Sequence, residues 1–169
     1  MNKEINPIKF QEIINDLNNQ KFDSALKKLN LLSKQYSNNH LINKLFASVY
    51  LKKMDWNNAI KYYEKTLFFE KEKFKVYANI GVALFRLGQI TKSIDAFKKS
   101  IKDNSNFDLA YNNLGISYLE IGMHEKAINS FISTLKLNKN NFFAQKNLIN
   151  ILNLIKPKNV NEHFLIDIN

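Results

Sequence analysis

The apolar and polar positions of this chain repeat every 34 residues across its centre. Residues 40–73, 74–107 and 108–141 overlay on one another in this register. The same residue recurs at that distance in several pairs, among them Gly81 and Gly115, Gly88 and Gly122, Phe97 and Phe131, and Tyr77 and Tyr111. A period of this length is typical of arrays in which each copy is one supersecondary unit stacked on the next. The pattern predicts an all-α chain built from antiparallel helix pairs.

Each copy places small residues where the two helices of a pair would meet. In the last copy the eighth, twentieth and twenty-fourth residues are Gly115, Ala127 and Phe131. A side chain of one carbon or none lets helices approach closely, and an aromatic ring then fills the space beside it. We therefore expect positions 8 and 20 to meet inside each pair. Small residues at position 27 should leave room for the first helix of the next copy: Thr66, Ser100 and Thr134.

The turns inside and between the pairs can also be located. Gly88 and Gly122 stand at position 15, where we expect the first helix to end in a left-handed residue. Met54 holds this place in the first copy, and Asp55 is predicted to cap the helix that begins at Trp56. Asparagine-rich turns at 38–39, 104–106 and 138–141 should end the second helices. Residues 70–73 contain no such breaker.

Two incomplete copies flank the three full ones, so we predict one array over residues 1–155. Residues 6–39 form a degenerate repeat, in which Ala25 and Leu29 fit positions 20 and 24. Residues 142–155 form a single capping helix, with Leu148, Ile149 and Leu152 at positions 7, 8 and 11. Residues 156–169 are a linker and tail. The apolar stretch 163–168 either folds back over the last helix or begins a further part of a longer protein.

The residues at these positions resemble the tetratricopeptide repeat family, well over residues 21–155 and loosely over 7–20. The last copy shows it best: Tyr111, Leu114, Gly115, Tyr118, Ala127, Phe131 and Thr134. The resemblance implies a right-handed α-solenoid. It also implies a non-catalytic protein-interaction scaffold whose concave groove binds an extended polypeptide. The alternative is the N-terminal substrate-recruiting region of a larger enzyme, such as a glycosyltransferase or sulfotransferase.

In this family the first helices line the groove. Position 6 is asparagine in three copies, and apolar residues follow at positions 9 and 12, giving the predicted peptide-binding groove: Asn79, Val82, Phe85, Asn113, Ile116, Leu119 and Asn147. A side-chain amide both donates and accepts, so a column of amides can pair with a peptide backbone of any sequence. Similar asparagine ladders hold peptides in O-linked N-acetylglucosamine transferases. The alternative is a solvated face, because asparagine is abundant throughout this chain.

Some relatives bind acidic chain termini with a two-carboxylate clamp of lysine, arginine and asparagine. The five clamp positions here hold Lys44, Ser48, Asn79, Leu109 and Asn113. Two of the five match the family's clamp. We therefore do not expect a receptor for chaperone tails.

The formal net charge of +10 raises the question of nucleic acid as a partner. Arg86 is the only arginine among 25 basic residues, and the lysines form no dense run. Recognition of phosphates and bases relies on the planar arginine fork. We expect no nucleic-acid partner, and a protein or peptide partner that can be acidic. Without cysteine, an N-terminal secretory pattern or a membrane-length apolar run, the chain is predicted to be cytoplasmic, with no membrane contact.

The side chains that usually carry chemistry are scattered. His40, His124 and His163 lie in separate turns, with no carboxylate at metal-ligand spacing. No phosphate-binding loop, dinucleotide fingerprint or nucleophile elbow occurs. We predict no catalytic, cofactor-binding or metal-binding residue, and no enzymatic activity.

Overall fold

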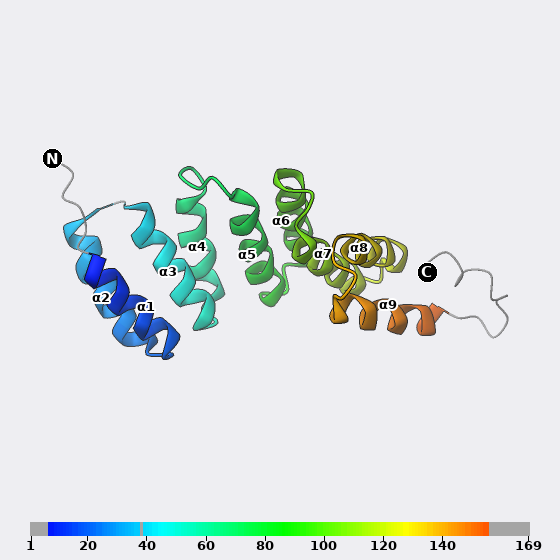
Figure 1. Cartoon of the computed structure of the whole chain (residues 1–169), viewed down its shortest axis with the longest axis horizontal. Coiled ribbons are helices and arrows are strands. Elements are labelled where there is room, and N and C mark those ends of the chain that lie inside the picture. The colour runs from blue at the N-terminus through cyan, green and yellow to red at the C-terminus, as the bar shows by residue number, and fades with distance from the viewer. Residues whose placement is uncertain (1–6, 38, 156–169) are drawn as a thin grey trace. The chain divides into compact units, whose positions relative to one another are not determined.

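The structure is a computed structural model that describes residues 7–37 and 39–155 (Figure 1). The predicted tail, residues 156–169, lies outside the described residues. Within the described ranges all regular structure is helical. The helices are α1 (Pro7–Asn18), α2 (Phe22–Gln35), α3 (His40–Lys52), α4 (Trp56–Thr66), α5 (Lys73–Arg86), α6 (Ile90–Asp103), α7 (Asp108–Glu120), α8 (His124–Leu137) and α9 (Phe142–Ile155).

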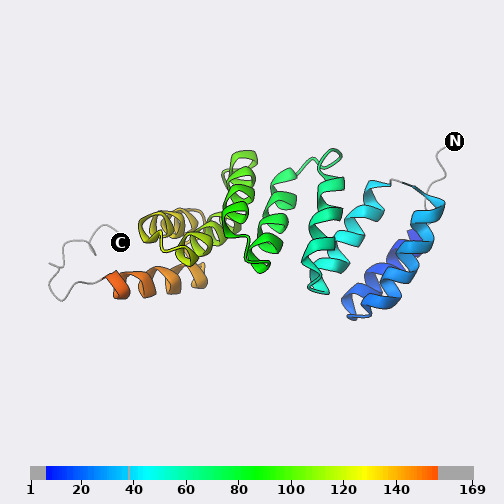
Figure 2. The same ribbon diagram turned by 180° about the vertical axis from the view of Figure 1, so that it is seen from behind.

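The helices fall into two compact units, residues 1–105 and residues 106–169. In the first unit each helix from α1 to α6 packs against the next one along the chain, as Figures 1 and 2 show from opposite sides. In the second unit α8 packs against both α7 and α9, and α7 also contacts α9. This neighbour-to-neighbour packing is what a stack of helix pairs requires.

The turn inside each pair has one geometry, repeated every 34 residues. Gln20, Met54, Gly88 and Gly122 all have positive φ, between 57° and 72°. In each turn the next residue donates its N–H to a carbonyl five residues back, as Gln89 does to Leu84 at 2.9 Å. This is the Schellman closure of a helix C-terminus. The left-handed prediction for Gly88 and Gly122 is confirmed, and Gln20 carries the same turn into the N-terminal pair.

Asparagine and aspartate hold the other helix ends. Asp55 caps α4 by accepting the N–H of Asn58 at 3.2 Å, as predicted. Asn39 accepts the N–H groups of Leu41 and Ile42 at the start of α3. Asn104 ends α6 in extended backbone, and Asn138 ends α8 with φ −143° and ψ 89°. Local side-chain competition with helical hydrogen bonds explains why these residues mark boundaries.

The contact that closes a pair lies between positions 8 and 24. A Cβ atom built on Gly81 would lie 2.6 Å from Cε1 of Phe97, and one on Gly115 would lie 2.7 Å from Cε1 of Phe131. Both rings are almost fully buried. The sequence pattern placed this contact at position 20, but the nearest atoms belong to the ring at position 24. The ring lies directly on the glycine, so no β-carbon fits.

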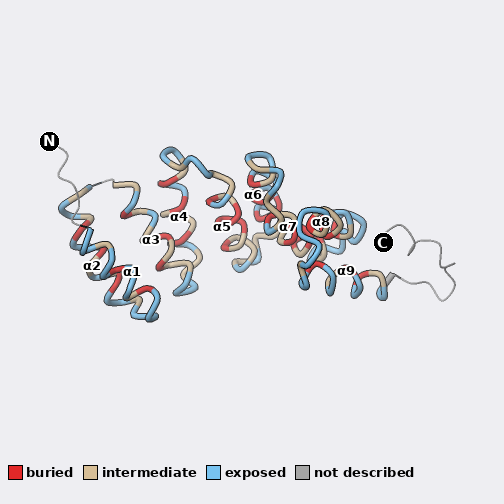
Figure 3. The backbone as a smooth tube through the Cα atoms, viewed as in Figure 1, coloured by how far each residue is buried: buried red, intermediate tan, exposed pale blue. Residues whose placement is uncertain are grey.

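The sequence pattern missed two buried positions of the first helices. Position 3 and position 10 are buried in every copy from α3 onward: Ile42, Val76, Ala110 and Ala144, and Val49, Ala83, Ser117 and Ile151. Figure 3 shows buried stretches recurring along these helices. The residues at these positions vary in size between copies, from alanine and serine to isoleucine, so no single residue type marks them. Their 34-residue spacing was the signal that could have found them.

The last helix has one face buried and another open. Ala144, Leu148 and Ile151 on α9 are buried, whereas Ile149 is 58% exposed. Ile149 stands at position 8, the position that in α5 and α7 meets the ring of a second helix. Within the described residues no second helix follows α9, so this position has no covering ring there.

Candidate functional site

All seven predicted groove residues are half-buried side chains on first helices. Asn79, Val82 and Phe85 lie on α5 in the first unit. The second unit holds the other four: Asn113, Ile116 and Leu119 on α7, and Asn147 on α9. Since α7 and α9 contact each other, the structure brings these four into one compact unit. The candidate site is therefore described separately for each unit.

In the first unit, α6 fixes the start of α5. Asp103 on α6 accepts the backbone N–H of Phe74 at 2.8 Å, and Ser100 donates to the carbonyl oxygen of Phe74 at 2.7 Å. A carboxylate at the start of a helix also interacts favourably with the positive end of the helix dipole. These contacts tie the first turn of α5, the helix that carries Asn79, Val82 and Phe85, to the end of α6.

In the second unit, three side chains of α7 follow one another along a single face. Asn112, Ile116 and Leu119 are spaced four and three residues apart, the spacing that puts residues on one side of a helix. Asn113 lies next to this row. We call Asn112, Ile116 and Leu119 the α7 row. It begins with an amide and continues with two apolar side chains.

Hydrogen bonds at the helix ends hold α7 and α9 in place. Asn138, which ends α8, donates to Asp108 at the start of α7 at 2.9 Å. Asn141 accepts the N–H of Ala144 in the first turn of α9 at 3.0 Å. The asparagine-rich turn between α8 and α9 therefore fixes both first helices of this unit.

The amides predicted to bind a ligand are not engaged. Within residues 7–37 and 39–155, the side chains of Asn79, Asn113 and Asn147 make no hydrogen bond. Each stays half-buried. Such an amide has its donor and acceptor capacity available for a ligand or for water.

Asn112 differs from these three because it is buried. The residue is 8% exposed, and its Oδ1 atom finds no hydrogen-bond partner in the described part of the chain. Buried polar atoms almost always have a partner, so this exception asks for an explanation. Sequence analysis did not single out Asn112. Its place at position 5, among asparagines at position 6, was the available signal.

Of the five positions of the carboxylate clamp, one holds a cationic side chain, Lys44. Lys44 pairs with Glu70, with Nζ and Oε1 at 2.9 Å. Ser48 donates to the carbonyl oxygen of Lys44, and Leu109 is an exposed apolar side chain.

Burial also perturbs one phenol of the first unit. Desolvation raises the pKa of Tyr63 to about 12, against a smaller opposing effect of its hydrogen bond with Ser48. Tyr63 holds position 24 of its pair, the place that phenylalanine fills at 97 and 131. Its role is packing within the core around Ala47 and Ala59.

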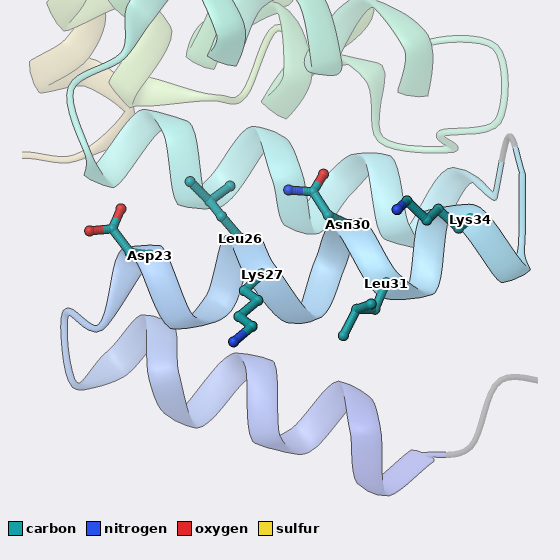
Figure 4. A pocket seen from close by; sticks show the side chains of 6 residues that line it. All are labelled: Asp23, Leu26, Lys27, Asn30, Leu31 and Lys34. Atoms are coloured by element: carbon teal, nitrogen blue, oxygen red, sulfur yellow. The ribbon is translucent and has the colours of Figure 1, made fainter.

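A shallow hollow lies on α2, away from the predicted residues (Figure 4). Its lining comes from one helix: Asp23, Leu26, Lys27, Asn30, Leu31 and Lys34. Asp23 pairs with Lys53, while Lys27 and Lys34 flank the exposed Leu31. A hollow formed by one helix surface does not enclose a small molecule, because such sites are concave and bury most of their ligand.

Among residues 7–37 and 39–155, no three histidine, aspartate or glutamate side chains come together as metal ligands. No helix in that part of the chain combines the length and apolarity that crossing a membrane requires.

Two family models match the chain, one described as TPR repeat over residues 83–122 and one as tetratricopeptide repeat over residues 109–141. None of the curated proteins matches it in sequence.

Solved structures are similar in fold. MamA is 23% identical, with a TM-score of 0.75 over 82% of this chain and 81% of that one. The Arabidopsis OM64 TPR domain is 18% identical, with a TM-score of 0.65 over 69% and 96%. The first TPR of Spaghetti (RPAP3), bound to the HSP90 peptide SRMEEVD, is 23% identical, with a TM-score of 0.64 over 68% and 91%. The fold is an all-α solenoid of helix pairs, as the sequence predicted.

Proposed function

We propose that this chain, which belongs to the tetratricopeptide repeat family, is a non-catalytic scaffold that binds an extended polypeptide along its first helices. One observation carries the proposal. Unengaged, half-buried asparagines recur at Asn79, Asn113 and Asn147, one on each of three first helices. An amide that has no partner of its own can pair with either group of a peptide bond.

Apolar residues beside these amides support the same ligand. Val82 and Phe85 on α5, and Ile116 and Leu119 on α7, are half-buried. Partial exposure leaves apolar area that a ligand can cover, at about 25 cal/mol per Å² removed from water. Amides that hold the backbone and apolar rows that hold alternate side chains together suit an extended peptide.

Similar folds bind acidic peptides, and our proposal departs from them in one respect. RPAP3 domains of this fold have been solved with the HSP90 peptide SRMEEVD and the HSP70 peptide SGPTIEEVD. In the present chain Lys44 is already paired with Glu70, and position 109 is leucine. We therefore propose recognition of the peptide backbone rather than of a terminal carboxylate.

Charge adds a preference without defining the site. Residues 1–105 hold 19 of the 25 basic and 10 of the 15 acidic residues, a net charge of +9, which leaves +1 for residues 106–169. Excess charge of one sign attracts partners of the other and speeds their association. The proposal therefore includes acidic proteins as the preferred partners of the first unit, in the cytoplasm.

The test begins with peptides selected from a displayed library of random 12-residue sequences on the purified protein. The tightest peptide is titrated against the parent and against a variant with Asn79, Asn113 and Asn147 changed to alanine. A net hydrogen bond is worth about 0.5–1.5 kcal/mol, so the triple variant should bind roughly tenfold to a thousandfold more weakly.

A matched control removes three exposed amides from second helices: Asn30, Asn57 and Asn129 changed to alanine. This control should bind as the parent does. Equal affinities of both triple variants would show that the asparagines of the first helices are a solvated face, and would disprove the proposed site.

A further inference from the structure

We infer that the connection between α4 and α5 is a second docking surface of the first unit, where an acidic partner protein encloses the exposed ring of Phe68 with apolar side chains. Four residues define this α4–α5 surface: Phe68, Phe69, Lys71 and Lys73. Figure 3 shows the connection exposed along most of its length. None of the four is a groove residue, so the inference goes beyond the proposed function and does not rest on it.

Phe68 stands where the other second helices carry a lysine. Position 29 of their copies holds Lys34, Lys102 and Lys136. Lysine is typical of a position that faces water. Phe68 is 86% exposed, more than any other large apolar side chain that the structure describes. The fold therefore does not require an aromatic ring at this position, and a partner that covers the ring would remove its apolar area from water.

The helix before Phe68 ends early. It stops at Thr66, position 27 of its copy, whereas α2, α6 and α8 all continue to position 30. Six residues consequently connect α4 to α5, and four residues connect the helices at each of the other three junctions between pairs. The early end takes Phe68 out of the helix and places it in the connection.

Packing explains Phe69, and Phe69 in turn holds Phe68. The ring of Phe69 stacks on His40 with 5.5 Å between the ring centroids. This contact joins positions 30 and 1 of one pair, as the hydrogen bond between Asp103 and Phe74 does in the next pair. Phe68 meets Phe69 edge-on, with the ring centroids 5.1 Å apart. An exposed ring held in this way loses little freedom on binding, and aromatic anchors contribute much of the affinity of protein interfaces.

The charges beside the ring favour an acidic partner. Both carboxylates of the connection are paired within the chain: Glu70 with Lys44 at 2.9 Å, and Glu72 with Lys75 at 2.7 Å. Lys71 and Lys73 have no ion-pair partner among the described residues. Two uncompensated cations thus follow Phe68 closely along the chain, and carboxylates around the apolar side chains of a partner would complement them.

Two other occupants fit this surface less well. A second copy of the chain carries a net charge of +10 itself, and like charges repel. An anionic bilayer would also face the exposed carboxylates of Glu64 and Glu72, because its charge covers the whole surface. A protein can place its own carboxylates opposite the lysines alone.

The probe is a 12-residue peptide selected from the displayed random library on the parent protein, in the presence of excess soluble Phe68→Lys. This variant copies the lysine of the other second helices, so it removes every peptide that binds elsewhere. Selection should enrich peptides that combine aspartate or glutamate with apolar residues. If no peptide survives the competition, or if the survivors lack an excess of acidic residues over the starting library, the inference is overturned.

The selected peptide is then synthesised and titrated against variants of the whole chain by calorimetry. Phe68→Lys should bind it about tenfold more weakly or worse, as loss of an aromatic anchor does. Exchange of both Lys71 and Lys73 for glutamine should weaken binding about threefold and reduce its dependence on salt. The matched control is Phe143→Lys on α9, which removes a 69% exposed ring in edge-on contact with a neighbouring phenylalanine and should bind as the parent does. Equal binding by the parent and Phe68→Lys would disprove the surface.

Three measurements separate this surface from its alternatives. The variant with Asn79, Asn113 and Asn147 changed to alanine should bind the selected peptide as the parent does, and a loss of about tenfold would place the peptide in the groove and overturn the inference. Co-sedimentation of the parent with vesicles of phosphatidylcholine and phosphatidylglycerol in equal parts, if lost in Phe68→Lys, would assign the ring to a lipid surface instead. By circular dichroism Phe68→Lys should melt at the temperature of the parent, and a lower melting temperature would make Phe68 a packing residue.

Discussion

The helix pairs α3–α4 and α7–α8 occupy the same register but close with different residues. In α3–α4 position 8 is Ala47 and position 24 is Tyr63, and both belong to one buried cluster. In α7–α8 the same positions hold Gly115 and Phe131, with the ring directly on the glycine. The turn residue differs too, with Met54 in one pair and Gly122 in the other, both left-handed. The backbone geometry at each position is thus the same in both pairs. The residues at these positions differ in backbone strain and in how large a substitution they allow.

The pair α7–α8 should break first when position 8 grows. Gly115→Leu would force a branched side chain into the fully buried ring of Phe131, whose Cε1 lies 2.7 Å from the position of a β-carbon. Overpacking of this kind costs about 1–3 kcal/mol or more, because the buried ring or the backbone must shift. Urea unfolding measures the loss. Lys136→Gln on the exposed surface of α8 is the control and should be nearly silent; equal stability of both variants would show the register to be wrong.

Alkaline pH should distinguish the two pairs next. The folded pKa of Tyr63, about 12, lies above the ordinary value of 10.0 because burial disfavours the phenolate. The contribution of the buried neutral phenol to the free energy of unfolding is therefore fully present below about pH 10 and is lost as the pH rises towards 12. The loss approaches about 2–3 kcal/mol, at 1.36 kcal/mol for each pH unit between the two values.

The variant Tyr63→Phe isolates this effect, because it gives position 24 of the pair α3–α4 the phenylalanine that the pair α7–α8 has at Phe131. Its stability, measured by urea unfolding from pH 9 to pH 12, should fall less steeply than that of the parent. Parallel curves would show that Tyr63 titrates as it does in the unfolded chain.

The turns should show a smaller difference of opposite sign in the two pairs. Met54 has a φ of 62°, a left-handed conformation that is strained for methionine and that glycine adopts readily. Met54→Gly should stabilise the chain by about 0.5–1 kcal/mol, and Gly122→Ala should destabilise it by a similar amount. Thermal unfolding compares both with the parent. Destabilisation by Met54→Gly would mean that the exposed methionine side chain makes contacts that outweigh the backbone strain.

These contrasts show what the sequence could and could not predict. The fold followed from the period, since glycine turns and small crossing residues repeat with it. The end of α4 could not be predicted in this way, because residues 70–73 contain no glycine, proline or asparagine that would end a helix. The helix nevertheless stops at Thr66, and the connection that follows is held by Phe69 stacked on His40 and by Glu70 paired with Lys44. Contacts between elements that are distant along the chain leave no local pattern to read.

The candidate site was predictable in the same uneven way. The asparagines at position 6 were visible because they repeat. Asn112 was harder to see, since its one sequence signal is its place beside position 6, and Ala78 and Lys146 hold the equivalent positions of α5 and α9. Its distinguishing property is an unsatisfied buried oxygen. Burial depends on how the neighbouring helices pack on α7, and that is a property of the folded protein.

The smallest expected effect concerns position 8 once more, now on α9. Ile149 is the counterpart of Gly115, but it is 58% exposed. Ile149→Ser should therefore change the free energy of unfolding by no more than about 0.5 kcal/mol, as at an ordinary surface position. Leu148→Ala, at the buried neighbour, should cost about 2–5 kcal/mol in the same assay. A loss at Ile149 close to that at Leu148 would contradict this prediction. It would show that residues outside the described ranges cover α9, and would favour the apolar stretch 163–168 as the covering segment over its alternative as the start of a further part of a longer protein.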